Sequence, residues 1–294
     1  MLTLTGITLK SGRKTWLKDV SFTAKARRIT GVVGPRGSGK TELTRIIMGL
    51  IEPDSGTITL EGHELGFGDR QNFGYLPSER GGYPNMKVLE QIVFFARLHG
   101  MTMGAAERNA VTLLSRLDLS DRAYAPLSHL SGTEVARVDI AAILAADPDV
   151  VVLDEPFDGL DAASSEKVFE LLRDHADSGV PIVFTSDSWE LTQAAADDII
   201  VLSHGTIAGE GTLTELRADH RSYRADFADE ASATAAEAHL TASPGVATAA
   251  RTGDSVAFEA NDVDAAGAAV TGLSGLRGFT TVEPSLAELF KEKV

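Results

Sequence analysis

Residues 34–41, which read GPRGSGKT, have the composition and spacing of a loop that binds phosphate. The glycines allow successive backbone N–H groups to point inward, and Lys40 supplies a cation for the β and γ phosphates of a nucleotide. Thr41 offers its hydroxyl group to Mg²⁺, and a helix that starts here aims its N-terminus at the same anion. The candidate nucleotide-binding residues of this stretch are Gly34, Pro35, Arg36, Gly37, Ser38, Gly39, Lys40, Thr41 and Glu42.

Two adjacent carboxylates, Asp154 and Glu155, follow an unbroken apolar run over residues 150–153. Such a run is typical of a parallel strand that is buried on both faces, and open α/β sheets bind their ligands at the carboxyl ends of strands. Asp154 is the candidate for holding Mg²⁺ through its water shell. Glu155 is the candidate general base that polarises an attacking water molecule.

The hydrophobic pattern predicts the elements that must position these groups. Apolar residues alternate over residues 1–33 as they do in strands, and the last apolar run ends at the glycine-rich loop. Helical spacing follows residue 41, a short strand is expected at residues 57–60, and residues 182–184 repeat the apolar run that precedes Asp154. The pattern predicts an α/β fold with a parallel central sheet.

Two domains are predicted along the chain. Residues 1–217 form the first, with a helical insertion over about residues 86–147, and residues 218–294 form a small α+β module, because the composition shifts toward Ala, Thr, Asp and Ser near residue 219. The module is either a packing or dimer-stabilising appendage, or partly disordered in its Ala-rich pieces. Its expected strands are 223–227, 246–251, 255–259 and 279–282, and its expected helices are 231–242, 263–273 and 285–293.

Composition excludes several classes of protein. The chain of 294 residues carries 27 Lys and Arg against 42 Asp and Glu, a formal net charge of −15, so no nucleic-acid partner is expected and phosphate binding must come from local geometry. The absence of cysteine rules out disulfides and thiolate metal sites. No window approaches the roughly 20 apolar residues of a membrane span.

A third motif lies between the phosphate loop and the paired carboxylates. Residues 130–134 read LSGTE and open a predicted helix, and residues 159–161 read GLD. The order of phosphate loop, helical insertion, LSG helix start, apolar-Asp-Glu strand and GLD resembles that of the ATP-binding subunits of ABC transporters over residues 1–217. Three further segments resemble the exporter branch that handles drugs, sodium or lipids, namely 74–77 (GYLP), 211–212 (GT) and 284–290 (PSLAELF).

This resemblance implies a P-loop NTPase fold with a RecA-like core sheet, an antiparallel β subdomain and a helical subdomain, followed by the α+β C-terminal domain. It implies ATP and Mg²⁺ as cofactors, and a homodimer or heterodimer with a second nucleotide-binding subunit. In that dimer the LSG residues Ser131 and Gly132 contact the ATP held by the other subunit. It also implies a separate integral membrane subunit, so the chain is expected to be cytoplasmic and peripheral on the inner face of the cell membrane.

Five positions depart from the family pattern. By spacing, Ser11 takes the place of the aromatic residue that stacks on adenine, and Trp16 is the nearest aromatic. Ser78 stands where a glutamine usually senses Mg²⁺ and the membrane partner, and Thr133 stands where the helix start has its second glycine. Asp187 replaces the histidine that contacts the γ phosphate, and the fifth departure is at residue 42.

Glu42 is expected to point to solvent, because a carboxylate about 4 Å from a phosphate would cost about 4 kcal/mol at an effective dielectric constant of about 20. An ionised Asp187 donates no hydrogen bond, and loss of one preorganised donor typically costs about 10²–10³ in rate. We therefore expect an ATPase that powers export slowly or conditionally; a non-catalytic regulatory subunit of a heteromeric transporter is the alternative. The expected catalytic residues are Glu155 and Asp187, and the expected metal-binding residues are Thr41, Asp154 and Ser78.

The surface for the membrane partner is expected on the helical insertion, around residues 83–91. Residues 84–86, Phe94 and Phe95 are candidates for this surface. For the two phenylalanines, packing within the core of the insertion is an equally open interpretation, because large apolar side chains are usually buried.

Overall fold

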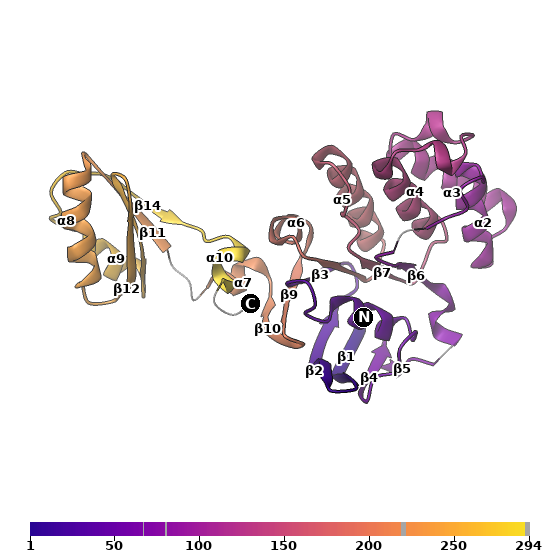
Figure 1. The fold of residues 1–294 in the computed structure, drawn as a ribbon, viewed down its shortest axis with the longest axis horizontal. Coiled ribbons are helices and arrows are strands. Elements are labelled where there is room, and N and C mark those ends of the chain that lie inside the picture. The colour runs from indigo at the N-terminus through magenta and orange to yellow at the C-terminus, as the bar shows by residue number, and fades with distance from the viewer. Residues whose placement is uncertain (67, 80, 219–221, 292–294) are drawn as a thin grey trace. The chain divides into compact units, whose positions relative to one another are not determined.

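The computed structural model describes residues 1–66, 68–79, 81–218 and 222–291. It divides into a first unit, Met1–Glu210, and a second unit that begins at Gly211 (Figure 1). This division falls before the expected boundary at residues 217 and 218. Helix α7 (Leu213–Arg217) belongs to the second unit because Arg217 Nε donates a hydrogen bond to the Pro284 carbonyl at 2.8 Å, beside helix α10 (Leu286–Phe290).

The first unit is built on a sheet in which the described residues form six strands. The order of these strands across the sheet is β10-β9-β3-β8-β7-β6. The pairs from β6 through β7, β8 and β3 to β9 are all parallel, as the apolar runs predict. The carboxyl ends of β3, β7 and β8 therefore meet at one edge. The strands are β3 (Ile29–Val33), β6 (Phe73–Leu76), β7 (Val150–Asp154), β8 (Ile182–Ser186), β9 (Asp198–Ser203) and β10 (Thr206–Gly211).

Both faces of this sheet are covered. Val151 and Leu153 of β7 pack into a core with the helices, whereas Val150 and Val152 pack into a second core with the antiparallel sheet and helix α1. This double burial explains why β7 is continuously apolar. The covering elements are β1 (Leu2–Ser11), β2 (Lys14–Ala24), β4 (Ser55–Leu60), β5 (His63–Glu64), α1 (Lys40–Ile47), α5 (Ala162–Asp177) and α6 (Trp189–Ala195) (Figure 1).

The expected helical insertion consists of α2 (Val88–Leu98), α3 (Met103–Arg116) and α4 (Gly132–Leu144). Two short 3₁₀ turns, Ser120–Arg122 and Leu127–His129, occupy the expected interruption. Helix α4 starts at a capping box, in which Ser131 Oγ accepts from the Glu134 N–H at 3.2 Å and Glu134 Oε2 accepts from the Ser131 N–H at 2.8 Å. The sequence motif LSGTE is thus a helix start.

The second unit contains a four-stranded antiparallel sheet in the order β12-β13-β11-β14, with α8 and α9 on one face (Figure 1). Tyr223, Ala225 and Phe227 of β11 alternate toward these helices and form the core with the small residues of α8, so the Ala-rich segment is an ordered helix. The order βαββαβ is that of the split βαβ motif. The elements are β11 (Ser222–Phe227), α8 (Glu230–Thr241), β12 (Val246–Thr252), β13 (Ser255–Ala260), α9 (Val263–Val270) and β14 (Leu276–Val282).

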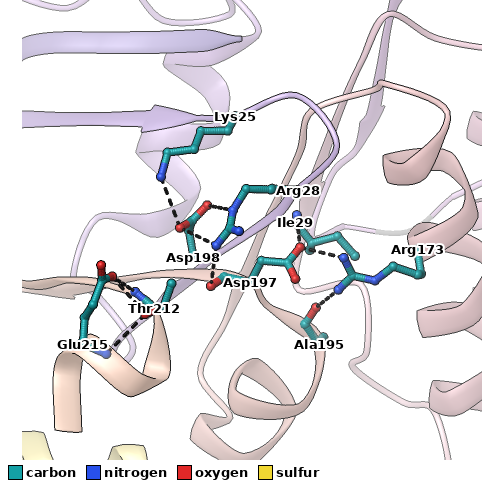
Figure 2. A network of polar contacts seen from close by, with 9 residues as sticks. All are labelled: Lys25, Arg28, Ile29, Arg173, Ala195, Asp197, Asp198, Thr212 and Glu215. Atoms are coloured by element: carbon teal, nitrogen blue, oxygen red, sulfur yellow. Dashed lines mark hydrogen bonds and ion pairs between the residues drawn. The ribbon is translucent and has the colours of Figure 1, made fainter. Parts of the chain in front are cut away.

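A polar network fixes the start of β3, at the end of the strand opposite to the phosphate loop. Arg28 Nε and Nη2 donate to the two carboxylate oxygens of Asp198 at 2.5 and 2.8 Å, and Asp197 accepts from the Ile29 N–H at 2.8 Å and from Arg173 Nη1 at 2.6 Å (Figure 2). Bidentate arginine–carboxylate pairs are geometrically specific. The network thereby holds β3, β9 and α5 together below the site.

Among the helices of the described residues, none has both the length and the apolar character needed to cross a membrane.

Candidate functional site

The phosphate loop connects the buried strand β3 to helix α1, which begins at Lys40. Its glycines are required by backbone geometry: Gly37 and Gly39 have φ angles of 81° and 108°. A Cβ on Gly39 would also lie 2.7 Å from the carbonyl oxygen of Trp16, and one on Gly34 would overlap the carbonyl oxygen of Leu202. Only glycine fits at Gly34 and Gly39, because the loop packs closely against the backbone of Trp16 and Leu202.

Lys40 is held at the centre of this loop. Its side chain is only 7% exposed, and its Nζ donates hydrogen bonds to the carbonyl oxygens of Gly34 at 2.7 Å and Pro35 at 3.2 Å. The same Nζ lies 3.5 Å from Oε1 of Glu155. The cation expected to contact phosphates thus faces the expected general base directly.

Asp154 is the last residue of β7 and is 1% exposed. Its Oδ1 accepts a hydrogen bond from Thr185 Oγ1 at 2.6 Å, while its buried Oδ2 has no hydrogen-bond partner among the described residues. A buried carboxylate oxygen without a donor is costly unless a cation or water satisfies it. Thr41 lines the cleft, as does Glu155, the residue after Asp154, and the Thr41 hydroxyl and the Asp154 carboxylate are oxygen ligands of the kind that Mg²⁺ prefers.

Glu155 has an unusual backbone conformation, with φ of 52° in the left-handed region. Two contacts hold it there: its N–H donates to Thr185 Oγ1 at 3.1 Å, and its Oε2 accepts from the Asp187 N–H at 3.1 Å. Burial raises the pKa of Glu155, Lys40 opposes this, and the negative charge of Asp187 adds to it. A strained residue with a raised pKa is typical of functional sites.

Lys40, Thr41 and Glu155 line one cleft of about 360 Å³ in the first unit, whereas the buried Asp154, which directly precedes Glu155, does not line it. The cleft brings together the phosphate loop, the start of α1 and the ends of β7 and β8. Glu42 also lines it and is half-buried, and the direction of its carboxylate stays a prediction. The lining residues are Trp16, Arg36, Gly37, Gly39, Lys40, Thr41, Glu42, Glu155, Asp158 and Asp187.

Seven expected site residues do not line this cleft. Gly34, Pro35 and Ser38 belong to the phosphate loop and Asp154 directly precedes Glu155, whereas the other three lie elsewhere. Ser78 is exposed in the segment after β6 and does not line the cleft in the described part of the chain. Ser131 and Gly132 lie at the start of α4, also outside the cleft of their own chain, where a Cβ on Gly132 would meet no atom within 4 Å. The neighbouring Thr133 donates its Oγ1–H to the Gly159 carbonyl at 3.0 Å.

Three residues join the site that the sequence analysis did not assign to it. Thr185 bridges the two carboxylates, Asp158 lines the cleft, and Trp16 contributes the aromatic wall, with the Lys14 ammonium 3.1 Å from the centroid of its ring. The signal for Thr185 was its place at the end of a parallel strand beside β7. Trp16, the aromatic nearest in sequence to the position of the adenine-stacking residue, lines the cleft.

Comparisons of this chain with family models, curated proteins and solved structures all point to one family. The family described as ABC transporter matches residues 17–158. The linearmycin resistance ATP-binding protein LnrL of Bacillus subtilis (strain 168) is 31% identical over 219 residues, which cover 74% of this chain and 70% of the relative. The uncharacterized ABC transporter ATP-binding protein YhaQ of the same strain is 29% identical over 297 residues, covering 100% of this chain and 98% of the relative.

A third relative, the daunorubicin resistance ATP-binding protein DrrA3 of Streptomyces coeruleorubidus, is 32% identical over 76% of this chain and 72% of its own length. A solved ATP binding subunit of an ABC transporter matches with a TM-score of 0.69 at 25% identity, over 74% of this chain and 92% of that chain. A bacterial ABC transporter cassette in a dimeric structure matches with a TM-score of 0.65 at 24% identity, over 72% and 98%. The expected P-loop NTPase fold is confirmed, and the chain belongs to the ATP-binding proteins of ABC transporters.

Proposed function

We propose that this chain binds ATP with Mg²⁺ in the cleft and hydrolyses it slowly to power export by a separate membrane subunit. The observation that carries the proposal is the convergence of Lys40 and Glu155, 3.5 Å apart, beside the unpartnered Oδ2 of Asp154. Relatives named for linearmycin and daunorubicin resistance support an export role. The fold alone would not, because one fold hosts many functions.

Four residues have chemical tasks in this proposal. Lys40 and the loop N–H groups bind the phosphates, and Thr41 and Asp154 would hold Mg²⁺. Mg²⁺, when bound, neutralises charge on the phosphate oxygens. Glu155 accepts a proton from the attacking water, for which its raised pKa keeps it a stronger base than an ordinary glutamate.

Metal binding gives a direct test of this assignment. The parent chain is expected to bind ATP more tightly with Mg²⁺ than with EDTA, measured by equilibrium titration. Asp154→Asn should lose most of this gain, because the amide cannot supply the anionic oxygen. Asp149→Asn, an exposed carboxylate just before β7, is the matched control and should behave as the parent does. Equal affinity of the parent chain with and without Mg²⁺ would contradict the proposal.

We further propose that the chain works as a dimer with a second nucleotide-binding subunit, identical or different. Ser131 and Gly132 lie outside their own cleft, and the exposed start of α4 leaves them accessible to the ATP of that partner. The relative solved as a dimer supports this proposal. Such a chain would act in the cytoplasm, held at the membrane by its partner.

The helical insertion carries the surface that we assign to the membrane subunit. A groove of about 520 Å³ runs between α2 and α3, with Phe94 37% exposed and Met103 and Tyr124 also exposed. Phe95, by contrast, packs against the core of the insertion. The groove includes Met86 of the expected surface, and its apolar side chains alternate with charged ones, so a short amphipathic helix of the partner would fit it. The charged lining residues are Lys87, Glu90, Arg97 and Glu107. Large exposed apolar patches mark interaction sites.

Copurification tests this docking surface. Phe94→Glu should reduce recovery of the membrane subunit with this chain, because it replaces the exposed aromatic side chain of the groove with a charge. Val111→Glu on α3, which is 56% exposed and does not line the groove, is the control for charge and exposure. Equal recovery with both variants would contradict the assignment.

A second candidate function, a non-catalytic regulatory subunit, is favoured by one observation. Asp187 adds a negative charge to the cleft at the position expected for a hydrogen-bond donor to the γ phosphate. In a heteromeric transporter, such a site could bind nucleotide while a partner chain hydrolyses it. The presence or absence of turnover that depends on Glu155 separates the two functions.

A further inference from the structure

Arg36 and Asp187 face each other across the cleft from two elements distant in sequence. Arg36 lies in the phosphate loop and Asp187 directly follows β8, and Arg36 Nε donates to Asp187 Oδ2 at 3.2 Å. The Arg36 side chain is 93% exposed and that of Asp187 is 42% exposed. No described residue accepts a hydrogen bond from the Nη groups of Arg36. Because Arg36 lines the cleft, these groups are available to a ligand bound there.

The charges of the cleft make this cation unusually important. Four carboxylates line the cleft, and its cations are Arg36 and Lys40. Lys40 is already engaged by two carbonyl oxygens and by Glu155. The chain as a whole carries a net charge of −15, so long-range attraction does not favour a triphosphate. The lining carboxylates are Glu42, Glu155, Asp158 and Asp187.

Guanidinium geometry allows one arginine to serve two anions. Its five N–H groups form a planar fork, so a carboxylate that binds Nε leaves the Nη groups to donate to a phosphate. A carboxylate at this place would repel a phosphate if it were unpaired, whereas a carboxylate that orients an arginine brings a positive donor to the same place.

We propose that Asp187 is a positioning residue that holds Arg36 over the phosphate loop, and that the Nη groups of Arg36 donate to the terminal phosphate of bound ATP. Arg36 thereby supplies the donor that residue 187 itself cannot. The inference rests on the proposed binding of ATP in this cleft, and it makes the chain selective for nucleoside triphosphate over diphosphate.

Binding of AMP-PNP and ADP, each with Mg²⁺, to the purified chain tests the proposal. Arg36→Gln should weaken AMP-PNP binding by about tenfold or more, as expected for loss of a charged hydrogen bond, and should change ADP binding much less. Arg36→Lys, which keeps the charge but loses the fork, should fall between the parent and Arg36→Gln. Retained ADP binding shows in each case that the variant is folded.

Asp187→Asn supplies the second arm of the test. Added to Arg36→Gln, it should recover part of the lost AMP-PNP affinity, because it removes the carboxylate that the first change left unpaired. Arg108→Gln, an exposed arginine on α3, is the control for loss of one positive charge. It should leave both affinities unchanged.

Two results would overturn the inference, and they show whether it fails alone or together with the proposed function. If the parent binds both nucleotides and Arg36→Gln binds them equally well, the pair is an ordinary exposed ion pair of little energetic value, and only this inference fails. If the parent binds neither nucleotide, the proposed function fails together with it.

Discussion

Lys40 Nζ lies 3.5 Å from Glu155 Oε1, so the phosphate loop and the end of β7 meet at a largely buried ion pair. Replacing Lys40 with alanine removes the cation that would bind the phosphates. We expect ATP affinity to fall by about tenfold to a hundredfold, as for other charged hydrogen bonds, measured by equilibrium titration with Mg²⁺. Lys18→Ala, an exposed lysine on β2, is the matched control. ATP affinity that stays at the parent level in Lys40→Ala would exclude the loop as the phosphate site.

The raised pKa of Glu155 predicts how stability depends on pH. Burial is its main cause, and the folded chain therefore holds this proton more tightly than the unfolded chain, where the pKa is near 4.5. The contribution of Glu155 to stability is complete below that value and is lost as the pH rises through the folded pKa. Glu155→Gln, which mimics the protonated form, should therefore be more stable than the parent at pH 8.

Urea unfolding of both proteins without nucleotide measures this difference. The advantage of Glu155→Gln should shrink as the pH falls and vanish below about pH 4, where Glu155 is protonated in both the folded and the unfolded parent chain. A difference in stability that is constant across this range would mean that the pKa of Glu155 is not raised.

Two of the three glycines of the phosphate loop, Gly37 and Gly39, make a matched pair. Gly37→Ala should cost about 1–2 kcal/mol of unfolding free energy, because its positive φ strains an alanine while its Cβ meets open space. Gly39→Ala should cost more, because the added Cβ would lie 2.7 Å from the Trp16 carbonyl oxygen and from Leu17 Cδ2. Thermal or urea unfolding compares them. Equal losses for the two variants would show that close packing under the loop is not the constraint.

Thr133 ties the start of α4 to the loop that follows Glu155, through its hydrogen bond to the Gly159 carbonyl. Thr133→Val keeps the shape and removes the hydroxyl, so we expect a loss of about 0.5–1 kcal/mol in unfolding free energy. Thr133→Ser keeps the donor and serves as the control. If the valine variant were as stable as the serine variant, the contact would carry no energy.

Much of the fold follows from local pattern. The continuous apolar run of residues 150–153 requires a strand buried on both faces, and the two cores confirm this. The alternation of Tyr223, Ala225 and Phe227 in the second unit likewise predicts one buried face, and the strand is present. The glycine-rich loop could be identified because phosphate binding needs glycine at fixed positions.

The rest of the site depends on contacts that no local pattern contains. Thr185 reaches Asp154 because these two residues are register partners between β7 and β8. Arg36 and Asp187 meet although 151 positions separate them in the chain.

The central claim is that Glu155 makes this cleft a working, slow ATPase. The decisive measurement is the rate of MgATP turnover by the chain purified with its membrane subunit, compared with Glu155→Gln and Asp187→His. We predict slow turnover that Glu155→Gln abolishes, since the amide cannot accept a proton from water, and that Asp187→His changes without abolishing. Equal background turnover in the parent and in Glu155→Gln, with ATP still bound, would contradict the claim and identify the chain as a nucleotide-binding regulatory subunit.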